Sequence, residues 1–183
     1  TSGNNIINES SDTITIGAAG DTVNVPGTAG TGFGKVLQTV SVETGALITA
    51  SSNVFPEDDT IPQSNEGTQV MSLAITPVNA SSKLHIFVNA FGSHSASTRT
   101  GIALFVDSTA NALAFSCSAN AGATTMMGAS LNYILTSAST DARTYKIRMA
   151  GMQSSGTLSF NGQGGARKFG GVASSSIIIM EIE

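Results

Sequence analysis

Apolar and polar residues alternate along most of the chain from residue 35 onward. Alternation with a period of two places successive side chains on opposite faces of a β-strand, whereas no long stretch holds a good helical period. The pattern predicts about eight to ten short strands, and therefore an all-β sandwich or jelly roll. The clearest runs are Met71-Leu73-Ile75, Leu84-Ile86-Val88-Ala90, Ile102-Leu104-Val106, Leu131-Tyr133-Leu135, Tyr145-Ile147-Met149 and Leu158-Phe160.

Three shorter patterns add local predictions. Val36, Val40 and Val42 are expected to share one face of a first strand. Leu113, Phe115 and Cys117 are expected to share a core-facing side, which makes Cys117 a small core residue. Asn161-Gly162 follows Phe160 directly, and this dipeptide is a strong hairpin signal.

The last strand, at residues 177–182, is apolar on both faces. Ile177 and Ile179 lie on one face, and Ile178, Met180 and Ile182 on the other. A strand that is apolar on both sides is expected to be buried on both sides. A sandwich buries only one face of each sheet, so we expect a neighbouring subunit to cover the second face.

Residues 12–29 differ from the rest of the chain because they contain a repeat. The unit Asp-Thr-(Ile/Val)-x-(Ile/Val) begins at Asp12 and again at Asp21. One such pair of strands buries too little to stand alone, but three copies around an axis could bury the Ile and Val stripe. The alternative is a flexible linker, which rarely places β-branched residues so regularly. We predict a repetitive shaft or trimerisation segment at 1–34, a glycine-rich junction at 28–34, and a jelly-roll head domain at 35–183.

Composition narrows the classes of function. Charged residues make up 11% of the chain, against about 25% in an average soluble domain, and the net charge is −4. Low charge is typical of subunits that bury much surface against copies of themselves. The chain has no basic run and no apolar run near the length of a membrane helix, so we expect neither nucleic-acid binding nor membrane insertion. A lone cysteine allows no intrachain disulfide and no cysteine-based zinc site.

The residues that usually carry catalysis form no recognised motif. The chain lacks a Gly-x-Ser-x-Gly element, and its two histidines, His85 and His94, lack metal-ligand spacing. Glu57, Asp58 and Asp59 are sequence neighbours, which favours a solvated charged loop over the alternative of a calcium site. Glu66 and Asp141 could join this loop in space. We therefore expect no enzyme, no catalytic residue, no bound metal and no cofactor.

Several structural segments nevertheless occur in a familiar order. They are Gly34-Lys35-Val36-Leu37-Gln38, Asp59-Thr60-Ile61-Pro62-Gln63, Leu73-Ala74-Ile75-Thr76-Pro77, Ala103-Leu104-Phe105-Val106-Asp107, and the closing Ile177-Ile178-Ile179-Met180-Glu181-Ile182. This order resembles the C-terminal heads of tailed-bacteriophage fibre and virion structural proteins, which are similar to the trimeric tumour-necrosis-factor-like jelly roll. Residues 12–26 resemble the shaft repeats of marine and cyanobacterial phage fibres. The resemblance implies a homotrimer on the surface of a virion.

The resemblance also implies a set of functions and partners. The first is a fibre head that attaches the particle to a host surface, with bacterial surface polysaccharide as its ligand and other virion proteins bound through the N-terminal end. The alternatives are a capsid decoration or head-fibre protein that stabilises the virion, and a polysaccharide-degrading tail spike. Degrading spikes usually carry a long parallel β-helix, for which this chain is too short. Loops 92–100 and 118–128 are the expected contact surfaces, with His94 and Arg99 as candidate receptor-binding residues.

Overall fold

The computed structural model describes residues 35–119, 122–153 and 155–183. The shaft predicted at 1–34 lies outside them. The described residues form twelve strands and one 3-10 turn, η1 (Phe169–Gly171). The strands are β1 (Val36–Thr44), β2 (Ile48–Ser52), β3 (Thr68–Ile75), β4 (Lys83–His94), β5 (Thr100–Val106), β6 (Ala114–Cys117), β7 (Met126–Thr136), β8 (Arg143–Gly151), β9 (Gly156–Phe160), β10 (Gly162–Gln163), β11 (Ala166–Arg167) and β12 (Ser175–Ile182).

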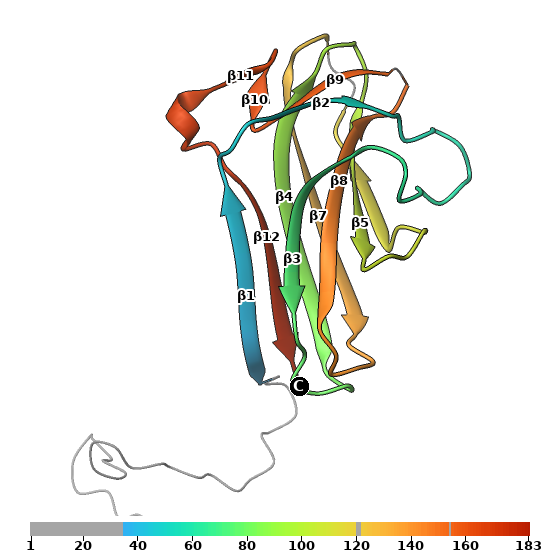
Figure 1. Ribbon diagram of the computed structural model, residues 1–183, viewed down its shortest axis with the longest axis vertical. Helices are drawn as coiled ribbons and strands as arrows, with labels where there is room; N and C mark the ends of the chain where they lie inside the picture. Colours follow the sequence, from blue (N-terminus) through green and yellow to red (C-terminus); the bar gives the residue numbers. More distant parts are fainter. Residues whose placement is uncertain (1–34, 120–121, 154) are drawn as a thin grey trace, which may run out of the picture. The chain divides into compact units, whose positions relative to one another are not determined.

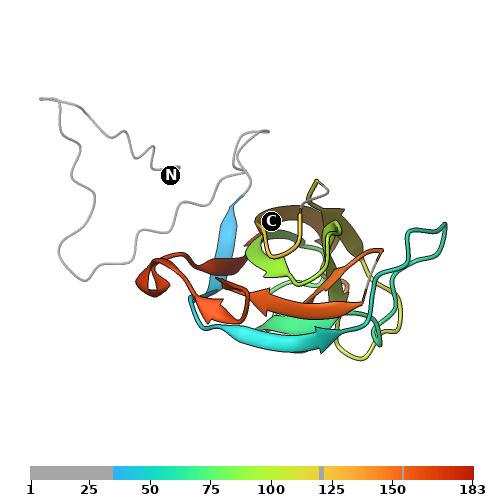
Figure 2. The same ribbon diagram turned by 90° about the horizontal axis from the view of Figure 1, so that it is seen from above.

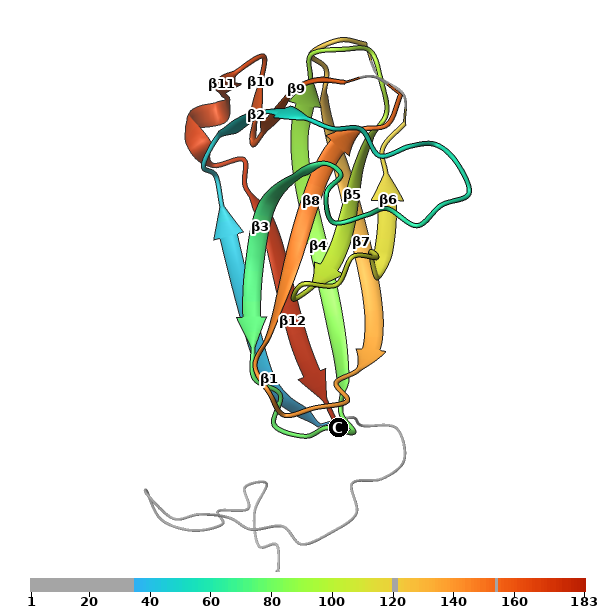
Figure 3. The ribbon, with the colours of Figure 1, turned by 45° about the vertical axis from the view of Figure 1, so that its right-hand side comes forward.

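The strands pair in a nested, antiparallel order. β1 pairs with β12, β2 with β9, β3 with β8, β4 with β7, and β5 with β6. Two four-stranded layers result, which we call the β12 sheet (β1-β12-β4-β7, extended by β9 and β2) and the β8 sheet (β3-β8-β5-β6). Figures 1 and 3 show the two layers along the long axis, with β2, β9, β10 and β11 at one end. Nested pairing in two sheets is the arrangement of a jelly roll, so the predicted fold class is confirmed.

The main core lies between the two sheets and follows the predicted alternation. Each sheet turns one set of alternate side chains inward, and these side chains are almost fully buried. The inward residues include Leu84, Ile86, Val88 and Ala90 of β4, Ile102, Leu104 and Val106 of β5, Tyr145, Ile147 and Met149 of β8, and Ile177 and Ile179 of β12. Burial of these apolar side chains provides the main driving force for folding.

Two of the local predictions were wrong because the alternation is interrupted. An irregularity in β1 lies between Val36 and Gln38, so Val40 and Val42 pack on the core while Val36 remains 48% exposed. The chain bends at Leu113 before β6 begins. Leu113 therefore packs on the main core, whereas Phe115 packs on a different cluster and Cys117 is exposed. Cys117 is not a core residue.

The hairpin predicted at Asn161-Gly162 forms three residues further on. β10 and β11 pair across Gly164 and Gly165, which both have positive φ, while Asn161 lies between β9 and β10. The Asn161 side chain is buried and donates to the carbonyl oxygens of Thr44 and Ala46, at 2.7 and 3.1 Å. Asn161 therefore anchors the β1–β2 connection instead of turning a hairpin.

A buried carboxylate ties the two sheets together at the end where β12 finishes. Glu181 accepts hydrogen bonds from the Gln38 side chain, the Ser82 hydroxyl and the backbone N–H groups of Val78 and Asn79, all at 2.6–3.0 Å. Burial raises the pKa of Glu181, but these four donors outweigh it and lower the pKa to about 2. The connection from β3 to β4 is thus fixed to the last strand.

Candidate functional site

Residues 53–67 form a long connection that covers part of the outer face of the β8 sheet. Phe55 is fully buried there against Ala103, Phe105 and Ala150, which form a second, smaller apolar cluster. The Phe55 N–H donates to the Gly151 carbonyl at 3.0 Å, which fixes the start of the loop to the end of β8. Figure 2 shows this segment in teal, extending beyond the end of β2. The sequence folds this way because Phe55 and Phe105 must find cover on a face turned away from the main core.

The far end of the same loop is held by Arg148. Its guanidinium donates to the carbonyl oxygens of Glu66 and Gly67, at 2.6 and 2.7 Å. Burial lowers the pKa of Arg148. Gly67 has a positive φ of 64°, and a Cβ at this position would lie 2.7 Å from the Phe55 ring, so only glycine fits. Loop 53–67 is therefore fixed at both ends.

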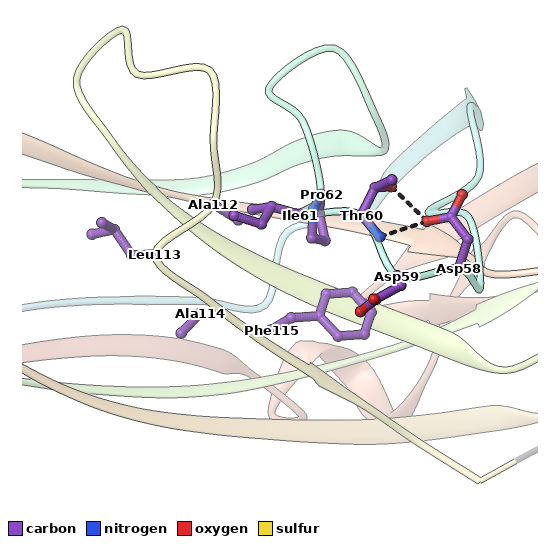
Figure 4. A pocket seen from close by; sticks show the side chains of 9 residues that line it. All are labelled: Asp58, Asp59, Thr60, Ile61, Pro62, Ala112, Leu113, Ala114 and Phe115. Carbon is purple, nitrogen blue, oxygen red and sulfur yellow. Dashed lines mark hydrogen bonds between the residues drawn. The ribbon is translucent and has the colours of Figure 1, made fainter.

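A pocket opens between this loop and the chain leading into β6 (Figure 4). Its volume is about 370 Å³. One wall is residues 58–62 and the other is residues 112–115. The lining is Asp58, Asp59, Thr60, Ile61, Pro62, Ala112, Leu113, Ala114 and Phe115. Apolar groups thus form the floor and two carboxylates lie on the rim.

The three neighbouring carboxylates of this loop have different surroundings. Glu57 forms an ion pair with Arg99, and one oxygen of Asp58 accepts from both the N–H and the hydroxyl of Thr60. The Thr60 hydrogen bonds lower the pKa of Asp58. Asp59 is exposed, and Figure 4 shows its side chain beside the Phe115 ring. Across the described ranges, no group of three or more His, Cys, Asp or Glu side chains is placed to hold a metal ion.

The two predicted receptor-binding residues lie at the end of the sandwich where β4 finishes. Arg99 has 47% of its side chain exposed and pairs with Glu57, so loop 92–100 contacts loop 53–67. His94 is only 3% exposed. Its Nδ1 accepts the Ala96 N–H at 3.2 Å, its Nε2 is buried with no hydrogen-bond partner among the described atoms, and burial lowers its pKa. Their role as receptor contacts stays a prediction, and in this conformation Arg99 is the accessible member.

Loops 92–100 and 118–128 lie side by side, although residues 120 and 121 are outside the described ranges. The Thr124 N–H donates to the His94 carbonyl at 2.8 Å, and Ser118 and Thr100 exchange backbone and hydroxyl hydrogen bonds at 2.9 and 3.2 Å. The two loops that the sequence analysis gave as expected contact surfaces are therefore neighbours in the fold, and their role in binding stays a prediction. A pocket of about 270 Å³ also lies at this end and is lined by Ser93, Ser95, Thr157, Ser159, Gly164 and Gly165.

The outer face of the β12 sheet presents apolar side chains from three neighbouring strands. Ile178 of β12 pairs with Phe87 of β4, and His85 of β4 lies between Met180 of β12 and Ile134 of β7. Phe87 and Ile134 remain 39% and 58% exposed, and Ile178, Met180 and Ile182 are partly buried. We call these five residues, Phe87, Ile134, Ile178, Met180 and Ile182, the open apolar face.

Sequence reasoning missed the pocket at Phe115. The alternation placed Phe115 beside Leu113 in the core, and the acidic residues 57–59 were interpreted as a solvated loop. Pro56 and Pro62, which bracket the acidic run, were the available signal that this loop has a restricted conformation. No signal in the sequence linked the loop to residue 115, because the two walls are about 50 residues apart.

Comparisons with solved structures gave distant likenesses. No family model and no curated protein matches the chain. Eiger TNF from S. frugiperda is similar in structure with a TM-score of 0.45 and 9% identity, over 79% of this chain and 93% of that chain. Infectious bursal disease virus Gx strain gives a TM-score of 0.35 and 14% identity, over 81% of this chain and 37% of that chain. The tailspike protein 4 enzymatically active domain of bacteriophage CBA120 gives a TM-score of 0.28 and 14% identity, over 69% of this chain and 19% of that chain.

At these TM-scores the likenesses carry no argument about activity, ligand or partner. The jelly-roll assignment rests instead on the nested strand pairing of the chain itself. In the part of the chain that the structure describes, no helix is long and apolar enough to cross a membrane.

Proposed function

We propose that this chain is the head of a bacteriophage fibre, a non-enzymatic virion protein that assembles as a homotrimer and attaches the particle to its host. The observation that carries the proposal is the open apolar face. Apolar side chains from three strands lie next to one another on a face turned away from the core. Apolar patches of this kind on a polar protein mark surfaces that bind another protein.

A second copy of the chain is the partner that fits this face best. The face is aliphatic and aromatic around His85, its central polar residue. Lys83 pairs with Ile182 at the end of the face, where its charge can stay in water while a like surface from an identical subunit covers the rest. The low charge of the whole chain favours the same partner. Three subunits that turn this face toward a common axis form a closed cyclic assembly.

Attachment is the function that the resemblance to phage fibre heads supports. Polar loops at the end of each head would meet bacterial surface polysaccharide, and three linked heads would raise weak single-site affinity by avidity. The N-terminal end would join other virion proteins.

The acidic side chains support a non-enzymatic role through the partners they already have. Glu57 pairs with Arg99, Asp58 holds Thr60, Glu66 accepts the Gln63 N–H at 2.8 Å, and Asp141 accepts the Ser139 hydroxyl at 2.7 Å. Each of these contacts fixes a loop, so the carboxylates act as local structural anchors.

The assembly is tested by the mass of the full chain in solution. Sedimentation velocity at low protein concentration should give three chains per particle. A stable, folded monomer would contradict the proposal. Location on the particle is the second test, since labelling on the tail supports attachment, whereas labelling on the capsid would replace it with the decoration function.

Attachment itself is tested by binding of the labelled protein to intact host cells and to host cells stripped of surface polysaccharide. Binding should fall strongly on stripped cells. Equal binding to both, or none to intact cells, would reject the attachment function.

A further inference from the structure

We infer that the pocket between residues 58–62 and 112–115 binds a single sugar ring that is neutral or carries an amino group. This inference rests on the proposed attachment to surface polysaccharide and names the subsite and the sugar class. It is carried by three features of the pocket: a fixed apolar floor, walls that are tied together, and carboxylates on the rim.

The floor is fixed by packing beneath Phe115. The Phe115 ring meets the buried Phe55 ring edge to face, with centroids 5.4 Å apart and planes at 83°. Gly101 lies at the same buried contact, where an added Cβ would be only 2.4 Å from the Phe115 Cζ atom and 3.4 Å from the Phe55 Cδ2 atom. An aromatic ring held in one orientation offers a flat apolar surface to the C–H face of a sugar at low entropic cost.

The walls are tied together by hydrogen bonds at one end of the pocket. The Ala112 N–H donates to the Pro62 carbonyl at 2.9 Å, and the Ser64 N–H donates to the Ala110 carbonyl at 2.7 Å. The Gln63 side chain adds a bond to Asn111 at 3.1 Å. The pocket is therefore formed before any ligand binds, which lowers the free-energy cost of binding.

The rim determines the class of ligand. Asp58 uses one oxygen for Thr60 and leaves the other available, and no described residue donates to the Asp59 carboxylate. Ionised carboxylates accept hydrogen bonds from hydroxyl or ammonium groups and repel other anions. Uronic acids and phosphate-bearing sugars are thereby disfavoured. A volume of about 370 Å³ lies near the lower end for ligand pockets and suits one ring.

The pocket also remains accessible in the proposed trimer. Phe115 lies with Phe55 and Phe105 on the outer side of the β8 sheet, whereas the open apolar face belongs to the β12 sheet. β5 and β6 belong to one layer of the sandwich, and β4, β7 and β12 to the other, as the ribbon in Figure 3 shows. Assembly through one therefore leaves the other exposed, as repeated glycan binding by three heads requires.

The test is a titration of the full chain with free monosaccharides at pH 7, followed by NMR saturation transfer and chemical shifts. The probes are glucose, galactose, N-acetylglucosamine, glucosamine and glucuronic acid. At least one neutral or amino sugar should bind with a Kd on the order of 1–10 mM, and glucuronic acid should bind at least fivefold more weakly. Asp59→Asn and Phe115→Leu should each weaken binding about fivefold, the loss of one hydrogen bond or one ring contact.

Two matched substitutions serve as controls. Asp141→Asn removes an exposed carboxylate in another loop, and Phe169→Leu changes a phenylalanine that is 69% exposed elsewhere. Both should bind sugar as the unmodified chain does. If Phe115→Leu fails to fold, Asp59→Asn alone tests the pocket, because Asp59 is exposed and its substitution should leave the fold intact.

Three results would overturn the inference: no binding of any neutral or amino sugar, tighter binding of glucuronic acid, or equal losses in test and control variants. Binding of the same proteins to host cells, measured in parallel, distinguishes failure of the sugar-binding pocket from failure of the proposed attachment function. Cells that bind Asp59→Asn as well as the unmodified chain overturn the pocket and leave attachment standing. An unmodified chain that binds sugar but no host cells overturns attachment instead.

Discussion

The outer faces of the two sheets differ in how far their apolar side chains are covered. Both carry large apolar side chains on the side turned away from the core. On the β8 sheet these side chains are covered by the chain itself, because loop 53–67 places Phe55 over Ala103 and Phe105. On the β12 sheet, Phe87 and Ile134 keep much of their surface exposed.

The difference shows that alternation within a strand does not by itself determine whether an outward-facing side chain is exposed. Phe105 on β5 and Phe87 on β4 are both large apolar residues on outer faces, yet the first is 2% exposed and the second 39%. The first has a loop that reaches it, and we propose that the second is covered by another copy of the chain. Neighbouring substitutions can separate the two kinds of burial.

The largest expected effect comes from Ile179→Asp. Ile179 is fully buried between the sheets, so a carboxylate there loses its hydration without gaining a partner. We expect a loss of several kcal/mol, enough to unfold the head. Circular dichroism and urea denaturation of the purified variant measure it.

Ile178→Asp is the matched control for this experiment. Ile178 is the adjacent residue on the opposite face of β12. The substitution should leave the head folded and produce monomers in sedimentation. Unfolding of both variants, or normal trimers from both, would contradict the distinction between the core and the open apolar face.

The next largest effect is expected from Phe55→Ala on the covered face. Phe55 is fully buried, and its loss leaves a cavity beneath loop 53–67. We expect the free energy of unfolding to fall by about 3–4 kcal/mol. Limited proteolysis should then cut within loop 53–67 first. An unchanged urea midpoint would show that the loop contributes no cover.

A structural feature could be predicted from the sequence where it depends on interactions between residues close together in the chain, and not where it depends on distant ones. Alternation within single strands identified the inward residues of β4, β5, β8 and β12, because a period of two is a local property. The irregularity after Val36 and the bend at Leu113 were missed, since both are set by pairing with distant strands. The exposure of Cys117 follows from the second of these.

The candidate site was less predictable than the fold for the same reason. Arg99 was identified as a surface residue, but its pairing with Glu57 depends on a loop 42 residues away. His94 was placed in a polar loop, whereas packing against Gly156 buries it. The two walls of the Phe115 pocket meet only after β5, β6 and loop 53–67 are in place.

The third prediction concerns the carboxylate that joins the two sheets at one end. The pKa of Glu181 is lowered from 4.5 to about 2, so the folded state gains stability above pH 4.5 that is lost as the pH falls toward 2. Glu181→Gln should cost on the order of 2–3 kcal/mol at pH 7 and remove most of the pH dependence between 4.5 and 2. Urea denaturation at these pH values measures both effects. Glu183→Gln, at the exposed end of the chain, should behave as the unmodified protein, and an equal loss in both variants would contradict the role of Glu181.

The smallest effect is expected at the opposite end of β4, where His94 is buried with its Nε2 unpaired. Burial lowers the pKa of His94, so between its ordinary value of 6.5 and its lower folded value the unfolded chain binds a proton that the folded chain does not. Stability should therefore fall as the pH drops below about 6.5 and level off once the folded protein is protonated too.

His94→Gln should reduce this dependence of stability on pH. The change in free energy of unfolding should be smaller than the change expected for Glu181→Gln. The measurement is the difference in urea midpoint between pH 7 and pH 5. If His94→Gln keeps the slope of the unmodified protein, the imidazole of His94 is hydrated in the folded head. His94 would then be accessible to a receptor.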